Sequence, residues 1–182
     1  EDCEKCSQFT ICDEYKCNSL GAACEFKNDN GEEACIYANR GDTTPPVIDL
    51  LPITPLTDND FDPVGGSLNT GYQFNDQIPS YSSLEIGIKT NERSQCKISS
   101  LTGKTYDEMT NPFGNAQYLY EHKMTIPVSS EEELNGDQIV INKAGQSYTF
   151  YVKCQDVNGI KNLHDYFIKF NVNNAPDKQA RG

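Results

Sequence analysis

The chain of 182 residues contains no tryptophan, two methionines and two histidines. Neither His122 nor His164 lies near a nucleophile motif, and no Gly-x-Ser-x-Gly or His-Glu-x-x-His pattern occurs. No apolar run approaches the roughly 20 residues that cross a bilayer. We therefore expect neither an enzyme nor direct insertion of this chain into a membrane.

Positive charge is also scarce, with 15 basic residues against 27 acidic ones and a net charge of -12. Nucleic acids and anionic membrane surfaces are bound through clustered Lys and Arg, so we expect neither as a partner. No Asn-x-Ser/Thr acceptor occurs, which fits a prokaryotic surface protein at least as well as a eukaryotic glycoprotein. The acidic triplet 131–133 is typical of solvated surface.

Cysteine, by contrast, is abundant and unevenly placed. The first cluster consists of Cys3, Cys6, Cys12, Cys17, Cys24 and Cys35, while Cys96 and Cys154 stand apart. About forty residues are too few to bury a core, and units of that size usually need disulfides or a metal. An even, clustered count favours a disulfide framework in an oxidising, extracellular compartment, with fifteen pairings open for six cysteines.

Zinc is the main alternative for the cluster, because Cys3 and Cys6 have zinc-ligand spacing and Cys12 and Cys17 could supply a second pair. Two thiols would then be left over, and the nearest histidine is the distant His122. We favour disulfides and predict no firm metal site among the cysteines.

Composition divides the chain into a cysteine-rich unit at 1–40, a proline-containing linker at 41–46 and a β-domain at 47–174. A long stretch without periodicity, 52–83, interrupts the β-domain, and a polar tail follows at 175–182. In the small unit we expect one or two helical turns between Cys12 and Leu20. A short hairpin should follow around the Asn30-Gly31 turn.

The β-domain shows the period of two that is typical of half-buried strands. We expect a short first strand at 47–51, ended by prolines, and alternation predicts further strands at 84–89, 94–99, 118–128, 139–141, 148–154 and 166–172. Turn signals such as Asn91-Glu92 and Asn158-Gly159 separate them. Seven short strands without a long helical period indicate an antiparallel β-sandwich of the immunoglobulin or fibronectin type III kind.

Cys96 would lie on the third of these strands and Cys154 on the sixth. Those strands are neighbours in immunoglobulin-like topologies, so the two cysteines could form a disulfide between strands. A chain-entropy model assigns a bridge that closes so long a loop about 4 kcal/mol.

The 52–83 stretch is the first place to expect a specific contact surface, because it is long for a connection in a compact domain. Its aromatic residues Tyr72, Phe74 and Tyr81 are candidates for an interface with a protein or glycan ligand.

The same stretch carries alternating carboxylates at Asp58, Asp60 and Asp62, as calcium loops do. Pro63 replaces the required glycine and Asn69 replaces the final acid, so this is not an EF-hand. A looser calcium site remains an alternative to a solvated acidic loop, and calcium is the one cofactor that we consider.

The β-domain resembles fibronectin type III or immunoglobulin-like modules of secreted archaeal and bacterial surface proteins. The resemblance is carried by 42–48 (Asp-Thr-Thr-Pro-Pro-Val-Ile), 95–99, 106–109 and 148–159. Segment 12–26 similarly resembles a cysteine-rich block beside such modules in large archaeal surface proteins. The resemblance implies a spacer, an adhesive unit or a filament subunit, although the 52–83 stretch departs from the usual pattern.

We therefore predict an extracellular structural or adhesive module. In a sharper version it self-associates into a surface filament, with the 52–83 stretch added as a strand to a neighbouring sheet. A ligand-binding module for glycan or protein is the alternative, and a secreted hydrolase using His122 or His164 is less favoured.

Overall fold

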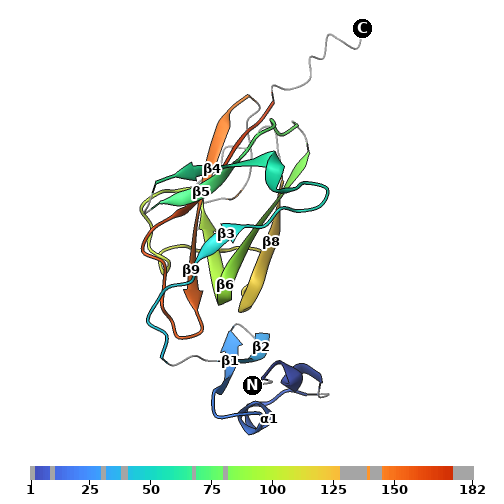
Figure 1. Ribbon diagram of the computed structural model, residues 1–182, viewed down its shortest axis with the longest axis vertical. Coiled ribbons are helices and arrows are strands. Elements are labelled where there is room, and N and C mark those ends of the chain that lie inside the picture. Colours follow the sequence, from blue (N-terminus) through green and yellow to red (C-terminus); the bar gives the residue numbers. More distant parts are fainter. Residues whose placement is uncertain are drawn as a thin grey trace.

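The computed structural model of the protein is mainly β, with a small disulfide-rich unit before the larger β-domain (Figure 1). The structure describes residues 3–8, 11–29, 32–37, 41–66, 69–79, 82–127, 139 and 145–173. Tyr81, the 131–133 triplet and the 175–182 tail lie outside this part, as does most of the strand expected at 139–141. Within the described part, no helix has both the length and the apolar character needed to cross a membrane.

The cysteine-rich unit consists of two short helices and one hairpin. Its elements are η1 (Cys3–Gln8), α1 (Glu14–Ser19), β1 (Cys24–Asp29) and β2 (Glu32–Tyr37). Helix α1 begins after Asp13, whose Oδ1 accepts a hydrogen bond of 2.8 Å from the Lys16 amide. Strands β1 and β2 pair antiparallel, with Cys24 opposite Tyr37.

Three disulfides join these elements, namely Cys3–Cys24, Cys6–Cys12 and Cys17–Cys35. The buried cluster of the unit consists of cysteines, with Leu20 and Phe26 packed against it. All eight cysteines of the chain are in disulfides, so no thiolate is left to bind zinc.

The β-domain is one eight-stranded sheet that curls around its core. Its strands are β3 (Ile48–Leu50), β4 (Phe61–Gly65), β5 (Thr70–Phe74), β6 (Ser83–Ser99), β7 (Asn111–Pro112), β8 (Leu119–Pro127), β9 (Ser147–Asp156) and β10 (Tyr166–Asn171). The main order is β3-β6-β9-β10-β5-β4, and β7 and β8 also pair with β6. The β5–β10 pair is parallel and the other pairs are antiparallel.

Strand β6 organises this sheet, because it pairs with four other strands. Residues 83–90 pair with β8 and β3, whereas 94–99 pair with β9 and the short β7, and Ser94 also pairs with Leu119 of β8. The register with β8 shifts between Lys89 and Ser94. Thus the two strands that the sequence predicts around Asn91-Glu92 are one strand with an irregularity at that position.

The structure also corrects the interpretation of 52–83 as a stretch without strands. The 3-10 turn η2 (Asp58–Asp60) leads into β4, and β5 then pairs with both β4 and β10. These strands escape the alternation test because β4 contains Pro63 and ends at Gly65, which has a φ of 95°. Strand β4 pairs with the neighbouring β5, but the other partner of β5 is the distant β10.

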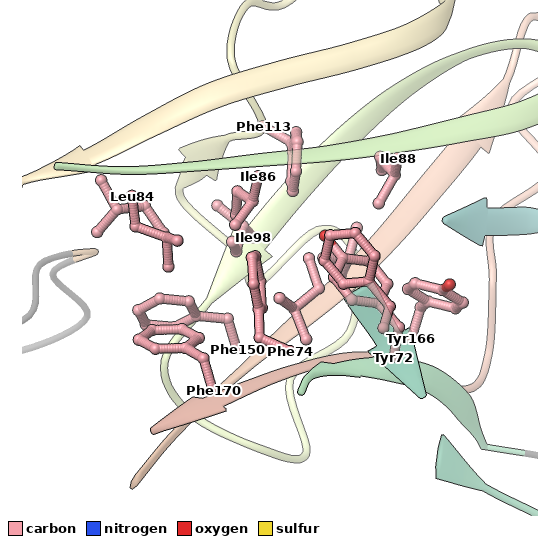
Figure 2. Packing of buried hydrophobic residues seen from close by; sticks show 14 of the residues in the cluster. Tyr72, Phe74, Leu84, Ile86, Ile88, Ile98, Phe113, Phe150, Tyr166 and Phe170 are labelled. Atoms are coloured by element: carbon pink, nitrogen blue, oxygen red, sulfur yellow. The ribbon is translucent and has the colours of Figure 1, made fainter. Parts of the chain in front are cut away.

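The core lies inside the curl of the sheet, where aliphatic side chains of β6 meet aromatic side chains of β5 and β10. Figure 2 shows Ile86 and Ile98 on one side of the interior, with Phe74 and Phe170 on the other. Phe113, Phe150 and Phe170 are among the largest fully buried side chains. Alternation along β9 and β10 therefore predicts the buried face correctly.

A fourth disulfide joins Cys96 of β6 to Cys154 of β9, which lie directly opposite each other in the pairing. Their Cα atoms are 4.0 Å apart, and both side chains are buried in the core cluster. The bridge thus links neighbouring strands of the curled sheet and closes a separation of 58 residues.

Candidate functional site

Of the aromatic residues proposed from sequence as a contact surface, the two that the structure describes, Tyr72 and Phe74, are core residues. Tyr72 and Phe74 are only 2% and 4% exposed. The Tyr72 hydroxyl donates a hydrogen bond of 3.1 Å to the carbonyl oxygen of Gly87, and the Phe74 ring packs edge-on against Phe61. The interface prediction is therefore corrected for both residues, because strand β5 turns them towards the core.

Of the carboxylates of Asp58, Asp60 and Asp62, only that of Asp60 has a structural role in the described part of the chain. Asp60 completes a capping box, since its Oδ2 accepts a hydrogen bond of 2.8 Å from the amide of Thr57. Asp58 and Asp62 are exposed. Among the described residues, the acidic group whose oxygens do converge is a different one.

That group consists of Asp42, Glu92 and Asp156, which we call the carboxylate triad. One oxygen of each side chain lies within 4.8 Å of the other two. Asp42 precedes the linker prolines, Glu92 lies at the irregular position of β6, and Asp156 ends β9. The triad thus joins three separate segments of the chain.

Local hydrogen bonds position Asp42. Its Oδ1 accepts hydrogen bonds from the amide and the hydroxyl of Thr44, at 2.9 and 2.8 Å. These two donors stabilise the ionised carboxylate and hold the pKa of Asp42 below its usual value. Asp42 is therefore an oriented anion, although it is only half-buried.

The backbone around Glu92 is held by two neighbouring hydroxyls. Thr90 and Ser94 donate hydrogen bonds of 2.7 and 3.0 Å to the carbonyl oxygen of Glu92. Both hydroxyl side chains are buried. The register of β6 shifts at this point. The two hydrogen bonds therefore give an irregular stretch a defined conformation, in which the Glu92 side chain lies in the triad.

Asp156 begins a tight turn that fixes its carboxylate. Its Oδ1 accepts hydrogen bonds of 2.8 Å from the amides of both Asn158 and Ile160. Gly159 has a φ of 82°, a conformation that side chains disfavour, and its amide donates to the Asp156 carbonyl oxygen. Asp156 is completely buried, and its Oδ2 has no hydrogen-bond partner among the described residues.

The three carboxylates affect one another electrostatically. Burial raises the pKa of Glu92 to about 7, and contact with Asp42 and the nearby charge of Asp156 contribute to the same shift. Within the described part of the chain, none of the three forms an ion pair with a basic side chain. Chemically, such a group can share a proton or bind a cation.

The triad lies at the junction between the two units. Figure 1 shows the cysteine-rich unit beneath the lower ends of β6, β8 and β9. Ile36 of β2 packs with Tyr118 and Val157 of the β-domain in a small buried cluster. Arg93 also forms an ion pair with Glu4 of the cysteine-rich unit.

A cleft of about 430 Å³ opens between the units at this junction. Glu4 and Tyr37 line it from the cysteine-rich unit, while Glu92 and Asn158 line it from the β-domain. Glu92 therefore belongs both to the carboxylate triad and to the wall of the junction cleft.

The two histidines are separate from this site and differ from each other. His122 is buried on β8, and its Nε2 lies 3.0 Å from the carbonyl oxygen of Leu119. Burial lowers the pKa of its imidazole, so the ring is neutral around pH 7. His164 is exposed in the segment that precedes β10.

Sequence analysis did not identify the triad, although two of its members lie in segments that carry the surface-module resemblance. The available signals were the position of Asp42 directly before Thr-Thr-Pro-Pro and that of Asp156 two residues before Asn158-Gly159. Glu92 carries no comparable signal, because only the irregularity in β6 makes it face the other two.

Comparisons of the chain with protein-family models and with curated proteins find no match. The functional argument therefore rests on the disulfides, the junction and the carboxylate triad.

Proposed function

We propose that the protein is an extracellular structural module of a cell-surface protein. The observation that carries this proposal is the junction, where two units stabilised in different ways share a packed contact. Ile36, Tyr118 and Val157 are each less than a tenth exposed there. A spacer that transmits force or sets a distance needs units that do not swing freely against each other.

The disulfides support an extracellular location. Four bridges in one chain are typical of oxidising compartments and uncommon where thiols are kept reduced. We include in the proposal that the β-domain is an immunoglobulin-like or fibronectin type III-like sandwich of the archaeal or bacterial surface type. Strand β6 supports this, because its two halves pair with different strands of the curled sheet.

Self-association into a filament remains a narrower version of the proposal, but it now rests on different strands. The 52–83 stretch already pairs within its own sheet, so it is not a free donor strand. Among the described strands, β3, β4, β7 and β8 each pair with one neighbour only, and β3 and β7 are just three and two residues long. Pro63 disfavours the addition of a further strand to β4, since proline cannot donate a backbone hydrogen bond to it. We therefore expect strand addition to use β8.

A second candidate, a ligand-binding module, is favoured by a groove in the 52–83 stretch. This groove, of about 400 Å³, lies between 53–56 and 74–85. Ile53, Pro55 and Leu84 provide apolar lining, and Asp76 and Glu85 provide carboxylates. Such a mixture suits a small apolar or glycan ligand. A glycan array that stays blank with and without calcium would remove the sugar version.

Antibody labelling of the cells that make the protein tests the structural proposal. We expect antibodies against the folded chain to label intact, unpermeabilised cells, and the unreduced protein to gain eight hydrogens in mass on reduction. Labelling only after permeabilisation, or free thiols in the native protein, would overturn it. Electron microscopy of the unreduced material then separates filaments from isolated modules.

A further inference from the structure

We propose that the carboxylate triad of Asp42, Glu92 and Asp156 is a calcium site that locks the junction between the two units. The spacing of the triad is the first argument. Oxygens bound to one Ca²⁺ at about 2.3–2.6 Å lie at most about 5 Å apart. One oxygen from each of the three side chains satisfies this limit, since all lie within 4.8 Å of one another.

A buried oxygen without a partner is the second and independent argument. Asp156 is 0% exposed, its Oδ1 already accepts two backbone hydrogen bonds, and its Oδ2 accepts none. Glu92 likewise has a buried Oε1 without a hydrogen-bond partner in the described part of the chain. Burying unsatisfied carboxylate oxygens is costly, and a bound cation satisfies both at once.

Charge gives the third argument. The triad brings together three acidic groups, and the nearest arginine in the sequence, Arg93, pairs with Glu4 instead. A divalent cation bound among the three oxygens neutralises this concentration of negative charge.

The donor set selects calcium among the common cations. All three ligands are hard carboxylate oxygens, and the triad contains neither cysteine nor histidine. Zinc favours sulfur and nitrogen ligands, while Mg²⁺ demands a near-ideal octahedron. Calcium tolerates irregular sets of six to eight oxygens and is bound by extracellular modules at about 10⁻⁴–10⁻³ M.

The neighbours of the ligands connect the cation to the junction. Glu92 precedes Arg93, which forms the ion pair with Glu4, and Asp156 precedes Val157, which packs on Ile36. Asp42 begins the segment that leads from the cysteine-rich unit into the β-domain. A cation that holds all three ligands thus fixes each chain segment next to its contact with the other unit.

Calorimetric titration of CaCl₂ into the full, unreduced chain after removal of metals tests the proposal. We expect one bound Ca²⁺ with a dissociation constant of about 10⁻⁴–10⁻³ M and weaker binding of Mg²⁺. Glu92→Gln and Asp42→Asn should each weaken Ca²⁺ binding about tenfold or more, and Asp156→Asn should abolish it. Circular dichroism verifies that each variant is folded.

The matched control is the double variant Asp58→Asn/Asp62→Asn, which removes the exposed carboxylates of the 58–62 loop and should bind Ca²⁺ as the wild type does. Loss of binding in this control would overturn the proposal, as would no binding to the stripped wild type or tighter binding of Mg²⁺. Should Asp156→Asn fail to fold, Glu92→Gln decides, because the half-buried Glu92 carboxylate makes no backbone cap. Wild-type affinity in folded Glu92→Gln would refute the site.

Discussion

The two units of this protein are stabilised by opposite means. In the cysteine-rich unit the buried cluster consists of cysteines, with few apolar side chains packed against them. In the β-domain the buried cluster is built from aliphatic and aromatic side chains, with a single disulfide inside it. The difference shows that a chain too short to bury apolar surface uses covalent cross-links, whereas a longer one relies on its core.

The same contrast is visible in how each unit would respond to the loss of one interaction. Disulfides act mainly by limiting the unfolded chain, and a unit that depends on them has little else to hold it. A packed core distributes its stability over many contacts, of which each is individually small. The predictions below test this contrast, beginning with the largest effect.

Reduction of all four disulfides should produce the largest difference between the two units. We expect the cysteine-rich unit to lose its structure completely, while the β-domain stays folded but loses about 4 kcal/mol with its long disulfide loop. Amide hydrogen exchange before and after reduction measures this, with protection lost in β1 and β2 but kept in β9 and β10. Loss of protection throughout the chain would show that the β-domain also depends on its bridge.

Truncation of the aromatic core should cost the β-domain about 3–5 kcal/mol. Phe150→Ala removes a ring that is 2% exposed and packs against Phe170, so it leaves a cavity in the core. Urea unfolding followed by circular dichroism measures the loss. The control Leu163→Ala, at a side chain that is 83% exposed, should change the free energy of unfolding by less than about 0.5 kcal/mol.

The junction should be easier to break than either unit. Ile36→Ala removes most of a buried side chain from its contact with Tyr118 and Val157, which we expect to cost about 2 kcal/mol. The two units should then reorient separately in ¹⁵N relaxation measurements, although each keeps its fold. Ile11→Ala, at an exposed position of the same unit, serves as the control. If the two units of the Ile36→Ala variant still tumble together, contacts other than that of Ile36 hold the junction rigid.

The smallest effect that we predict is a dependence on pH caused by His122. The folded-state pKa of this imidazole is lowered, so below about pH 6.5 the unfolded chain binds a proton that the folded chain does not. The contribution of His122 to stability is therefore present above this pH and is lost as the pH falls.

Urea unfolding at pH 7.5 and pH 5.5 should show a smaller loss on acidification for His122→Phe than for the wild type. His164→Gln should behave as the wild type does, because His164 is exposed. An identical pH dependence in all three proteins would mean that His122 is not the group that titrates.

Particular residues show how far sequence patterns carried and why they stopped. Alternation located β9 and β10, because every second side chain there faces the core. It missed β4 and β5, because Pro63 and Gly65 interrupt the pattern in β4 and one of the two partners of β5 is the distant β10. Because β5 was not recognised as a strand, Tyr72 and Phe74 were predicted to form a contact surface, whereas their alternation within β5 places them in the core.

Asn91-Glu92 has the composition of a turn, but the pairing of β6 with β8 resumes at Ser94, so the structure has one strand there. Local propensity for a turn was outweighed by pairing on both sides of the irregularity. The same irregularity then directs Glu92 into the triad, so the point where the pattern fails is also where the candidate site forms.

By itself, the sequence determined that this protein has two unequal units, that the first is held by disulfides and that the second is built from strands. Those properties follow from cysteine count, segment length and the period of two, which are local or additive. Only the tertiary structure decided which carboxylates meet. Asp42, Glu92 and Asp156 are separated by dozens of residues, and their oxygens come within 4.8 Å of one another only because β6 pairs with β9 and the segment after the cysteine-rich unit passes beside them.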